Sequence, residues 1–253
     1  MRALTLDDGR TVVVKTQSGA PPELFAAEAR GLAFLAEAGA LRIPEVLAVD
    51  PRFLVLEHLA SAPRRPDFDD RLGVGLAALH RACPGPLPGL DHDNFLGPLP
   101  QHNAPTPDWA TFYGERRLLP LVERNARILG TARVTRLEAL VASLPERVGP
   151  PEPPARLHGD LWAGNLLVDE RGLPALIDPA VFAGHREVDL AMMRLFGGFG
   201  PRVFAVYVEA HPLAPGHAER VPLYQLLPLL VHVALFGAGY LGSVDGALAA
   251  LGA

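Results

Sequence analysis

The stretch that decides the fold runs from Arg156 to Phe199 and reads RLHGDLWAGNLLVDERGLPALIDPAVFAGHREVDLAMMRLFGGF. Within it, the two apolar runs Leu166–Val168 and Leu173–Ile177 flank a polar turn, Asp169–Gly172, that ends in glycine. Two short apolar runs around such a turn are typical of antiparallel strands. The stretch therefore predicts a β-hairpin.

The hairpin brings two polar side chains together at its open end. If Val168 faces Leu173 across the turn, Asp178 lies diagonally opposite Asn165, on the order of 7–8 Å away. An amide oxygen and a carboxylate that converge without a competing thiolate suit a hard cation that prefers oxygen ligands. Asn165 and Asp178 are therefore the candidate ligands of Mg²⁺.

A third polar residue, Asp160, stands five residues before Asn165. In protein kinases a catalytic-loop Asp orients the attacking hydroxyl, an Asn five residues later holds magnesium, and a later Asp holds magnesium between the phosphates. The pattern HGDxxxxN followed by IDP thus resembles the small-molecule kinases of the kinase-like superfamily, such as aminoglycoside and choline kinases. The longer segments HGDLWAGN, IDPAVFAGHREVDLAM and RLFGGF look like the fructosamine kinase family, which includes the ketosamine-3-kinases. The alternative is a surface hairpin with ordinary turn carboxylates.

The basic residues add a second indication. Lys15 is the single lysine among 23 lysines and arginines, and it ends the β-branched run Val12–Val14. Kinase-type sites use a strand lysine as a compact charge on the α- and β-phosphates of ATP. Glu28 lies on the apolar face of the helix expected after Pro22, and a carboxylate there needs a cation. A Lys15–Glu28 pair follows, unless Glu28 only flanks the apolar stripe and is solvated.

Length and composition limit the possible classes of protein. The chain has 253 residues, 49% hydrophobic and 20% charged, which indicates a globular protein with a sizeable core. A net charge of −5 argues against non-specific nucleic-acid binding. The first residues lack the apolar core of a signal peptide, and the single cysteine, Cys83, cannot form an intrachain disulfide. We therefore expect a cytoplasmic protein. The apolar segment 221–241 is interrupted by prolines, so we expect a buried helix rather than a membrane span.

The resemblance implies an α+β, protein-kinase-like fold with two lobes. Residues 1–60 form a small lobe of sheet plus helix, and residues 61–253 form a larger, mostly helical lobe. Strands are expected at Leu4–Leu6, Thr11–Lys15, Pro44–Val49 and Phe53–Leu56. The chain then leaves the sheet at a hinge, where backbone groups near Glu57 and Leu59 would pair with adenine.

One departure from the family concerns the first hairpin. The family has a further strand and a glycine-containing loop over the ATP phosphates upstream of it, and no such loop can be drawn from the residues before Gly9. Either the start is truncated, or nucleotide binding relies on Lys15, Mg²⁺ and the hinge. A nucleotide-binding protein with little turnover therefore remains an alternative.

Four residues are candidates for the sugar substrate. Trp162 in the catalytic loop is a stacking platform or a core residue, and Trp109 is a substrate wall or a core aromatic. His185 and Glu187 are candidates for sugar contacts, with a helix N-terminus as the alternative. By contrast, His158 and Asp189 take structural roles, since Asp189 occupies the position of the acidic residue that braces the catalytic loop in the superfamily.

The resemblance implies transfer of the ATP γ-phosphoryl group to the 3-hydroxyl of a ketosamine, either fructosamine or ribulosamine. Asp160 accepts the hydroxyl proton, Asn165 and Asp178 hold Mg²⁺, and Lys15, positioned by Glu28, neutralises the other phosphates. The phosphorylated product releases its amine, so the reaction is a deglycation. The ketosamine is a small molecule or is bound to a protein, no nucleic-acid or membrane partner is expected, and the oligomeric state is open. An aminoglycoside, choline or another small alcohol is the alternative acceptor.

Overall fold

The computed structural model describes residues 2–253, and the fold mixes small antiparallel sheets with many helices. Along the chain the strands and α-helices are β1 (Arg2–Thr5), β2 (Thr11–Lys15), α1 (Leu24–Ala36), β3 (Val46–Asp50), β4 (Phe53–Glu57), α2 (Phe68–Arg81), β5 (Asn94–Leu96), β6 (Leu99–Gln101), α3 (Trp109–Phe112), α4 (Leu119–Leu129), α5 (Thr131–Ala142), β7 (Ala155–Leu157), β8 (Leu166–Val168), β9 (Pro174–Leu176), β10 (Phe182–Gly184), α6 (Glu187–Leu195), α7 (Pro201–Ala210), α8 (His217–Phe236) and α9 (Leu241–Ala250). Short 3₁₀ segments cover Leu144–Glu146, Ala163–Asn165 and Gly237–Tyr240, and a π-helical segment, Tyr113–Leu118, joins α3 to α4.

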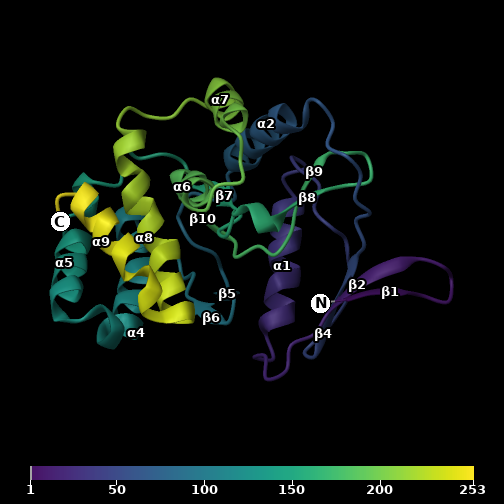
Figure 1. Cartoon of the computed structure of the whole chain (residues 1–253), viewed down its shortest axis with the longest axis horizontal. Coiled ribbons are helices and arrows are strands. Elements are labelled where there is room, and N and C mark those ends of the chain that lie inside the picture. The colour runs from purple at the N-terminus through teal and green to yellow at the C-terminus, as the bar shows by residue number, and fades with distance from the viewer. Residues whose placement is uncertain (1) are drawn as a thin grey trace.

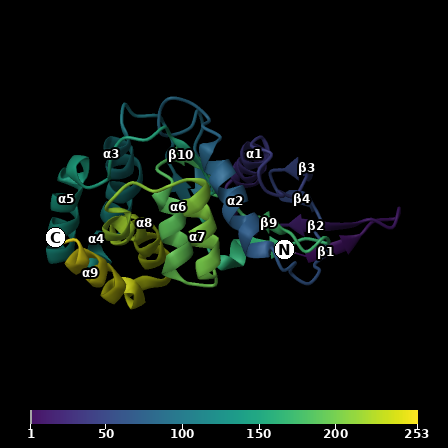
Figure 2. The same ribbon diagram turned by 90° about the horizontal axis from the view of Figure 1, so that it is seen from above.

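The elements are arranged along one long axis. The strands β1, β2 and β4 lie with α1 at one end of the molecule, and the helices α4, α5, α8 and α9 lie at the other (Figure 1). The short strands β7 and β10 and the helix α6 lie between these two ends. The view from above shows the same division (Figure 2). The α+β architecture expected from the sequence is therefore present.

The first sheet is antiparallel throughout and has the strand order β1-β2-β4-β3. Side chains alternate between the faces of a strand, so Leu54 and Leu56 share one face of β4. They belong to the same buried cluster as Phe25, Leu32 and Leu35 of α1. The four strands expected here are present. β2 has the expected bounds, and the ends of the other three shift by one or two residues.

The helical part begins with α2, which packs along α7 (Figures 1 and 2). Leu72, Leu76 and Leu79 recur at helical spacing and are fully buried. A Cβ atom on Gly73 would lie 2.7 Å from the carbonyl oxygen of Val203, so only glycine lets the two helices approach this closely.

The decisive stretch forms the expected hairpin, but its register differs by one residue from the prediction. Leu166 pairs with Leu176 and Val168 pairs with Pro174, so Val168 does not face Leu173. The cause is Asp169, whose carboxylate accepts the backbone N–H groups of Arg171 and Leu173 at 2.9 and 2.8 Å. These bonds stabilise a wider loop than the predicted turn.

Helix α8 is apolar enough to raise the question of a membrane span. The stretch from His217 to Ala250 has a mean hydropathy of 1.7 over its most apolar window, and half of that window is buried inside the protein. Leu226, Leu230 and Val233 of α8 belong to the larger core cluster, which also contains residues of α4, α5 and α9. The helix thus packs as a core helix of the helical part, as expected for this segment.

The second core cluster crosses the expected lobe boundary at residue 61. It joins Leu32 and Leu54 from the sheet-and-helix part to Leu72 and Leu76 of α2 and to Leu161 beyond β7. The division into lobes 1–60 and 61–253 stays a prediction.

Candidate active site

Residues 158–165, here called the catalytic loop, follow β7 directly and are braced by α6. The buried carboxylate of Asp189 accepts the backbone N–H groups of His158 and Gly159 at 2.8 and 2.9 Å, and it lies 3.2 Å from Nε2 of His80. Burial opposes ionisation of Asp189, but these hydrogen bonds and the nearby imidazoles lower its pKa below the ordinary value. A charged carboxylate therefore holds the backbone just ahead of Asp160.

His158 ties the catalytic loop to the strand that leads to Asp178. Its Nε2 lies 2.9 Å from the carbonyl oxygen of Ile177, and its Nδ1 accepts the backbone N–H of Asp160 at 3.2 Å. Burial lowers the pKa of His158, so the ring is neutral, and an accepting Nδ1 places the proton on Nε2. The contacts of His158 thus fix the spacing between Asp160 and Asp178.

The Asn165 side chain links Asp160 to Asp178. The Asn165 Nδ2 group donates to the backbone oxygen of Asp160 at 2.8 Å, to its carboxylate at 3.2 Å and to the backbone oxygen of Asp178 at 3.4 Å. Within residues 2–253, Asp178 is the one non-glycine residue with a positive φ, at 54°. Such a backbone costs energy and occurs preferentially at functional sites.

Lys15 lies between two carboxylates. Its Nζ contacts Glu28 of α1 and lies 2.5 Å from Asp178. Burial disfavours the charged form of Lys15, but Glu28 and Asp178 outweigh it and raise the pKa of the ammonium group. The side chain is therefore a fixed positive charge beside Asp178.

The pKa of the Asp160 carboxyl group is strongly shifted. Burial raises its pKa to about 6, the charges of Asp189 and Asp178 act in the same direction, and the hydrogen bond from Asn165 opposes them. A carboxylate with a pKa near neutrality is suited to accept a proton from a hydroxyl group.

Two cavities meet at Asp160. The first, here called the Lys15 cavity, has a volume of about 490 Å³ and is lined by Lys15, Glu28, Asn165 and Asp178. Its walls hold both a fixed cation and carboxylates, which suits a polyphosphate that carries a metal ion.

The second, here called the aromatic cavity, has a volume of about 540 Å³ and shares Asp160 and Trp162 with the Lys15 cavity. Its walls include Phe196, His232, Phe236 and Tyr240. The ring centroid of His232 lies 4.7, 5.3 and 4.9 Å from those of the three other residues. Sequence reasoning missed these rings, although the spacing of His232, Phe236 and Tyr240 along one helical face is a detectable signal.

Two glycines shape the boundary between these cavities. A Cβ on Gly164 would lie 2.2 Å from the indole of Trp162, so glycine leaves room for the ring to lie over the catalytic loop. A Cβ on Gly198 would lie 2.4 Å from Cβ of Ala163. The FGGF segment therefore packs directly on the catalytic loop.

The β5–β6 hairpin forms a wall between the two cavities and is fixed by amide groups. Gly97 at its tip lines both cavities. The Asn94 side chain donates to the backbone oxygen of Val181 at 2.7 Å, and Gln101 donates to Asn94 and to the backbone oxygen of Ala180 at 2.9 and 3.1 Å. The hairpin is thus tied to the segment after Asp178.

Three residues expected at the substrate do not line either cavity. Trp109 stacks within an aromatic core cluster, with ring centroids 5.7 and 5.3 Å from those of Phe112 and Tyr113. His185 is buried and stacks on Tyr224. Glu187 is buried and pairs with Arg220 at 2.6 Å. The structure therefore places Trp109, His185 and Glu187 away from the two cavities at Asp160, at and beyond the strand β10 that pairs with β7, and their contact with the substrate stays a prediction.

The family comparison agrees with this geometry. The family model described as fructosamine kinase matches residues 2–252. The chain belongs to the fructosamine kinase family. "Probable ketoamine kinase TTHA1179" of Thermus thermophilus is 46% identical over 239 residues, which cover 94% of this chain and 86% of that protein. "Protein-ribulosamine 3-kinase, chloroplastic" of Oryza sativa subsp. japonica is 33% identical over 93% of this chain and 71% of that protein.

Solved structures show the same fold. A candidate fructosamine-3-kinase from Thermobifida fusca superposes with a TM-score of 0.91 at 43% identity, over 99% of this chain and 89% of that chain. An aminoglycoside phosphotransferase superposes with a TM-score of 0.67 at 16% identity, over 98% of this chain and 88% of that chain. This fructosamine kinase family member therefore has the protein-kinase-like fold of small-molecule kinases.

The segment of this fructosamine kinase family member in which the hinge is expected follows β4. The Glu57 side chain contacts Arg42, and its backbone N–H donates to the carbonyl oxygen of Glu45 at 2.9 Å. Within residues 2–253, the backbone N–H of Leu59 donates to no protein group. Neither Glu57 nor Leu59 lines the Lys15 cavity, so their contact with adenine stays a prediction.

Proposed function

We propose that this protein transfers the γ-phosphoryl group of ATP to the 3-hydroxyl of a ketosamine. The observation that carries the proposal is the position of Asp160 at the junction of the two cavities. A group there reaches a phosphate chain on one side and an acceptor molecule on the other. In-line transfer of a phosphoryl group needs this arrangement.

Each polar residue of the site has one part in this reaction. Asp160 accepts the proton of the acceptor hydroxyl, whose oxygen attacks the γ-phosphorus while the bond to the bridging oxygen breaks and ADP leaves. Lys15, held by Glu28, neutralises the remaining phosphates. Asp160, with its raised pKa, is ionised near neutral pH and is therefore ready to accept this proton.

Asn165 and Asp178 fit a magnesium ion. The amide Nδ2 of Asn165 is engaged with Asp160 and Asp178, and within residues 2–253 no group donates to its Oδ1. That oxygen and the Asp178 carboxylate are hard ligands of the type that Mg²⁺ uses together with phosphate oxygens. When bound, the ion supplies positive charge at the phosphates. A relative with this fold, an aminoglycoside phosphotransferase, is described as a complex with ADP and hygromycin B.

The aromatic cavity suits the acceptor. Trp162 and Phe196 are 43% and 42% exposed and offer faces on which a sugar ring can stack. The residues that line this cavity include no arginine or lysine to pair with a carboxylate. This supports a ketosamine whose amine carries no free carboxylate nearby, such as a lysine within a polypeptide. A cytoplasmic location stays a prediction.

The test compares Asp160→Asn with the native protein in an ATP-consumption assay with Mg²⁺ and a ribulosamine or fructosamine. Loss of the base is expected to lower turnover by roughly 10²–10⁴-fold, with ATP binding retained. The matched control is Asp70→Asn, which removes a carboxylate that pairs with Arg202 on the surface. Equal turnover by Asp160→Asn and the native protein would refute the role of Asp160.

A substrate panel separates the remaining alternatives. Ribulosyl-lysine in a blocked peptide is expected to react faster than free ribulosyl-lysine, and both faster than choline or an aminoglycoside. If calorimetry shows ATP binding and no acceptor in the panel is phosphorylated, the protein is a nucleotide-binding protein without this activity.

A further inference from the structure

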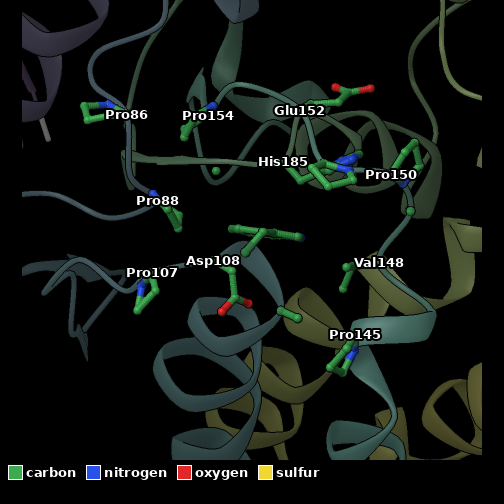
Figure 3. A pocket seen from close by; sticks show the side chains of 15 residues that line it. Pro86, Pro88, Pro107, Asp108, Pro145, Val148, Pro150, Glu152, Pro154 and His185 are labelled. Atoms are coloured by element: carbon green, nitrogen blue, oxygen red, sulfur yellow. The ribbon is translucent and has the colours of Figure 1, made fainter.

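A third cavity, here called the proline cavity, shares no lining residue with the two that meet at Asp160. Its volume is about 330 Å³, which is within the size range of small-molecule sites. Figure 3 shows Pro86 and Pro107 on one side and Pro145 and Pro150 on the other. Proline has a fixed φ, so these walls need little reorganisation when a ligand binds.

The inner wall is aromatic. Trp109 lines the cavity at the start of α3. A Cβ on Gly184 would lie 2.6 Å from this indole, so glycine at the end of β10 lets the ring pack against the strand. The Nε1 group of Trp109 donates to the Tyr224 hydroxyl at 3.1 Å, which fixes the orientation of the ring. The cavity therefore offers a rigid aromatic surface.

His185 supplies a hydrogen-bond donor without a protein partner. The residue is 6% exposed, and Figure 3 shows its ring among the side chains that line the cavity. Its Nδ1 accepts the backbone N–H of Glu187 at 3.3 Å, so the proton of the neutral ring is on Nε2. Nε2 is buried and has no hydrogen-bond partner among residues 2–253. A buried donor of this kind costs free energy until an acceptor reaches it, and because Nε2 has almost no accessible surface, the His185 ring must turn toward the cavity for an acceptor there to bind it.

The two carboxylates at the cavity already have partners. Glu152 pairs with Arg186 through two bonds of 2.7 and 2.8 Å. Asp108 caps α3 by accepting the backbone N–H and the hydroxyl of Thr111 at 2.9 and 2.8 Å. Among residues 2–253, no lysine or arginine lines the cavity to hold a phosphate, and its negative charges disfavour an anion. A sugar would leave most of its hydroxyl groups without partners.

We propose that the proline cavity binds an uncharged small molecule with a flat, largely apolar body and one hydrogen-bond acceptor. The body packs between Trp109 and the proline walls. The acceptor takes the hydrogen of His185 Nε2. This site is separate from the proposed transfer of phosphate and does not depend on it.

The chain offers a direct experiment because it has two tryptophans, and each lines a different cavity. In Trp162→Phe, the fluorescence of Trp109 alone reports on the proline cavity. The probe is acetanilide, which is flat and neutral and has one carbonyl acceptor. We expect saturable quenching by acetanilide, and much weaker effects of benzoate, which is an anion, and of benzylamine, which has no acceptor for His185 Nε2.

The donor is tested by adding His185→Phe to this variant, since phenylalanine keeps a ring beside Tyr224 and removes the N–H group. The change is expected to weaken acetanilide binding roughly tenfold. In the native protein labelled with ¹⁵N-histidine, acetanilide is expected to shift the His185 Nε2 resonance, a measurement that needs no variant. The absence of saturable quenching, equal binding by benzoate, or an unchanged His185 resonance would each overturn the proposal.

Discussion

The pKa of Asp160 makes a prediction about pH. Burial raises this pKa to about 6, and a general base works only in its ionised form. The kcat/KM value is therefore expected to rise as the pH increases through about 6 and to level off above it. A pH–rate profile measures this, with circular dichroism at each pH to show that the protein stays folded. A profile that is flat across this range would contradict the assignment.

Arg117 is a buried cation whose replacement should destabilise the fold. Its guanidinium carbon lies 4.5 and 4.0 Å from the ring centroids of Phe112 and Phe182, and burial lowers its pKa to about 9. It donates to the backbone oxygen of His102 at 2.7 Å and to the side chain of Asn103 at 2.6 Å. Lysine cannot replace this planar fork.

Arg117→Lys is therefore expected to lower the free energy of unfolding by about 2–4 kcal/mol, measured by urea denaturation. Arg116→Lys is the matched control, because within residues 2–253 the Arg116 guanidinium has a single long ionic contact, 3.6 Å from the Glu115 carboxylate. If both variants lose a similar amount of unfolding free energy, the buried guanidinium of Arg117 makes no special contribution to stability.

At the scale of elements, the FGGF segment between α6 and α7 gives a paired experiment. Gly197 and Gly198 both have a positive φ, but a Cβ on Gly197 meets nothing within 4 Å, whereas one on Gly198 meets Ala163 of the catalytic loop. Both alanine variants should lose about 1 kcal/mol of stability from backbone strain. Only Gly198→Ala is expected to displace the catalytic loop, with a loss of kcat of roughly tenfold or more. Equal kcat values in the two variants would exclude this contact as a determinant of activity.

The elements also show which parts of the site follow from sequence. The hairpin β8–β9 and the approach of Asn165 to Asp178 depend on neighbouring residues, so two apolar runs around a polar turn predict them. The pair Lys15–Glu28 follows from the cost of burying an unpaired charge. The one-residue error in register arose because the bonds of Asp169 to the loop backbone leave no mark in an apolar pattern.

Other parts of the site depend on which distant segments pack together. The aromatic cavity joins Trp162 to rings from the end of α8, some seventy residues later in the chain, and no local pattern gives that distance. Likewise, the sequence makes Trp109 and His185 candidates for the sugar substrate, but packing at β10 places them at a different cavity. Local sequence motifs identify a family, whereas long-range packing decides which cavity a residue lines.

At the scale of the whole molecule, the shared core predicts cooperative unfolding. Because one buried cluster joins the sheet-and-helix part to α2 and α7, the two parts should unfold together. ATP with Mg²⁺ at about 100 times its Kd should raise the midpoint by about 5–10 °C, since it binds the folded form. Calorimetry that resolved two transitions, with only one shifted by the nucleotide, would instead support independent lobes.

The scarcity of lysine has a consequence for the protein's own chemistry. Reducing sugars and acylating reagents attack unprotonated ε-amino groups. This chain has a single ε-amino group, that of Lys15. That amine is held between two carboxylates, which keep it protonated and therefore poorly nucleophilic. A protein from a family named for sugar adducts of amines thus presents almost no side chain on which such an adduct could form.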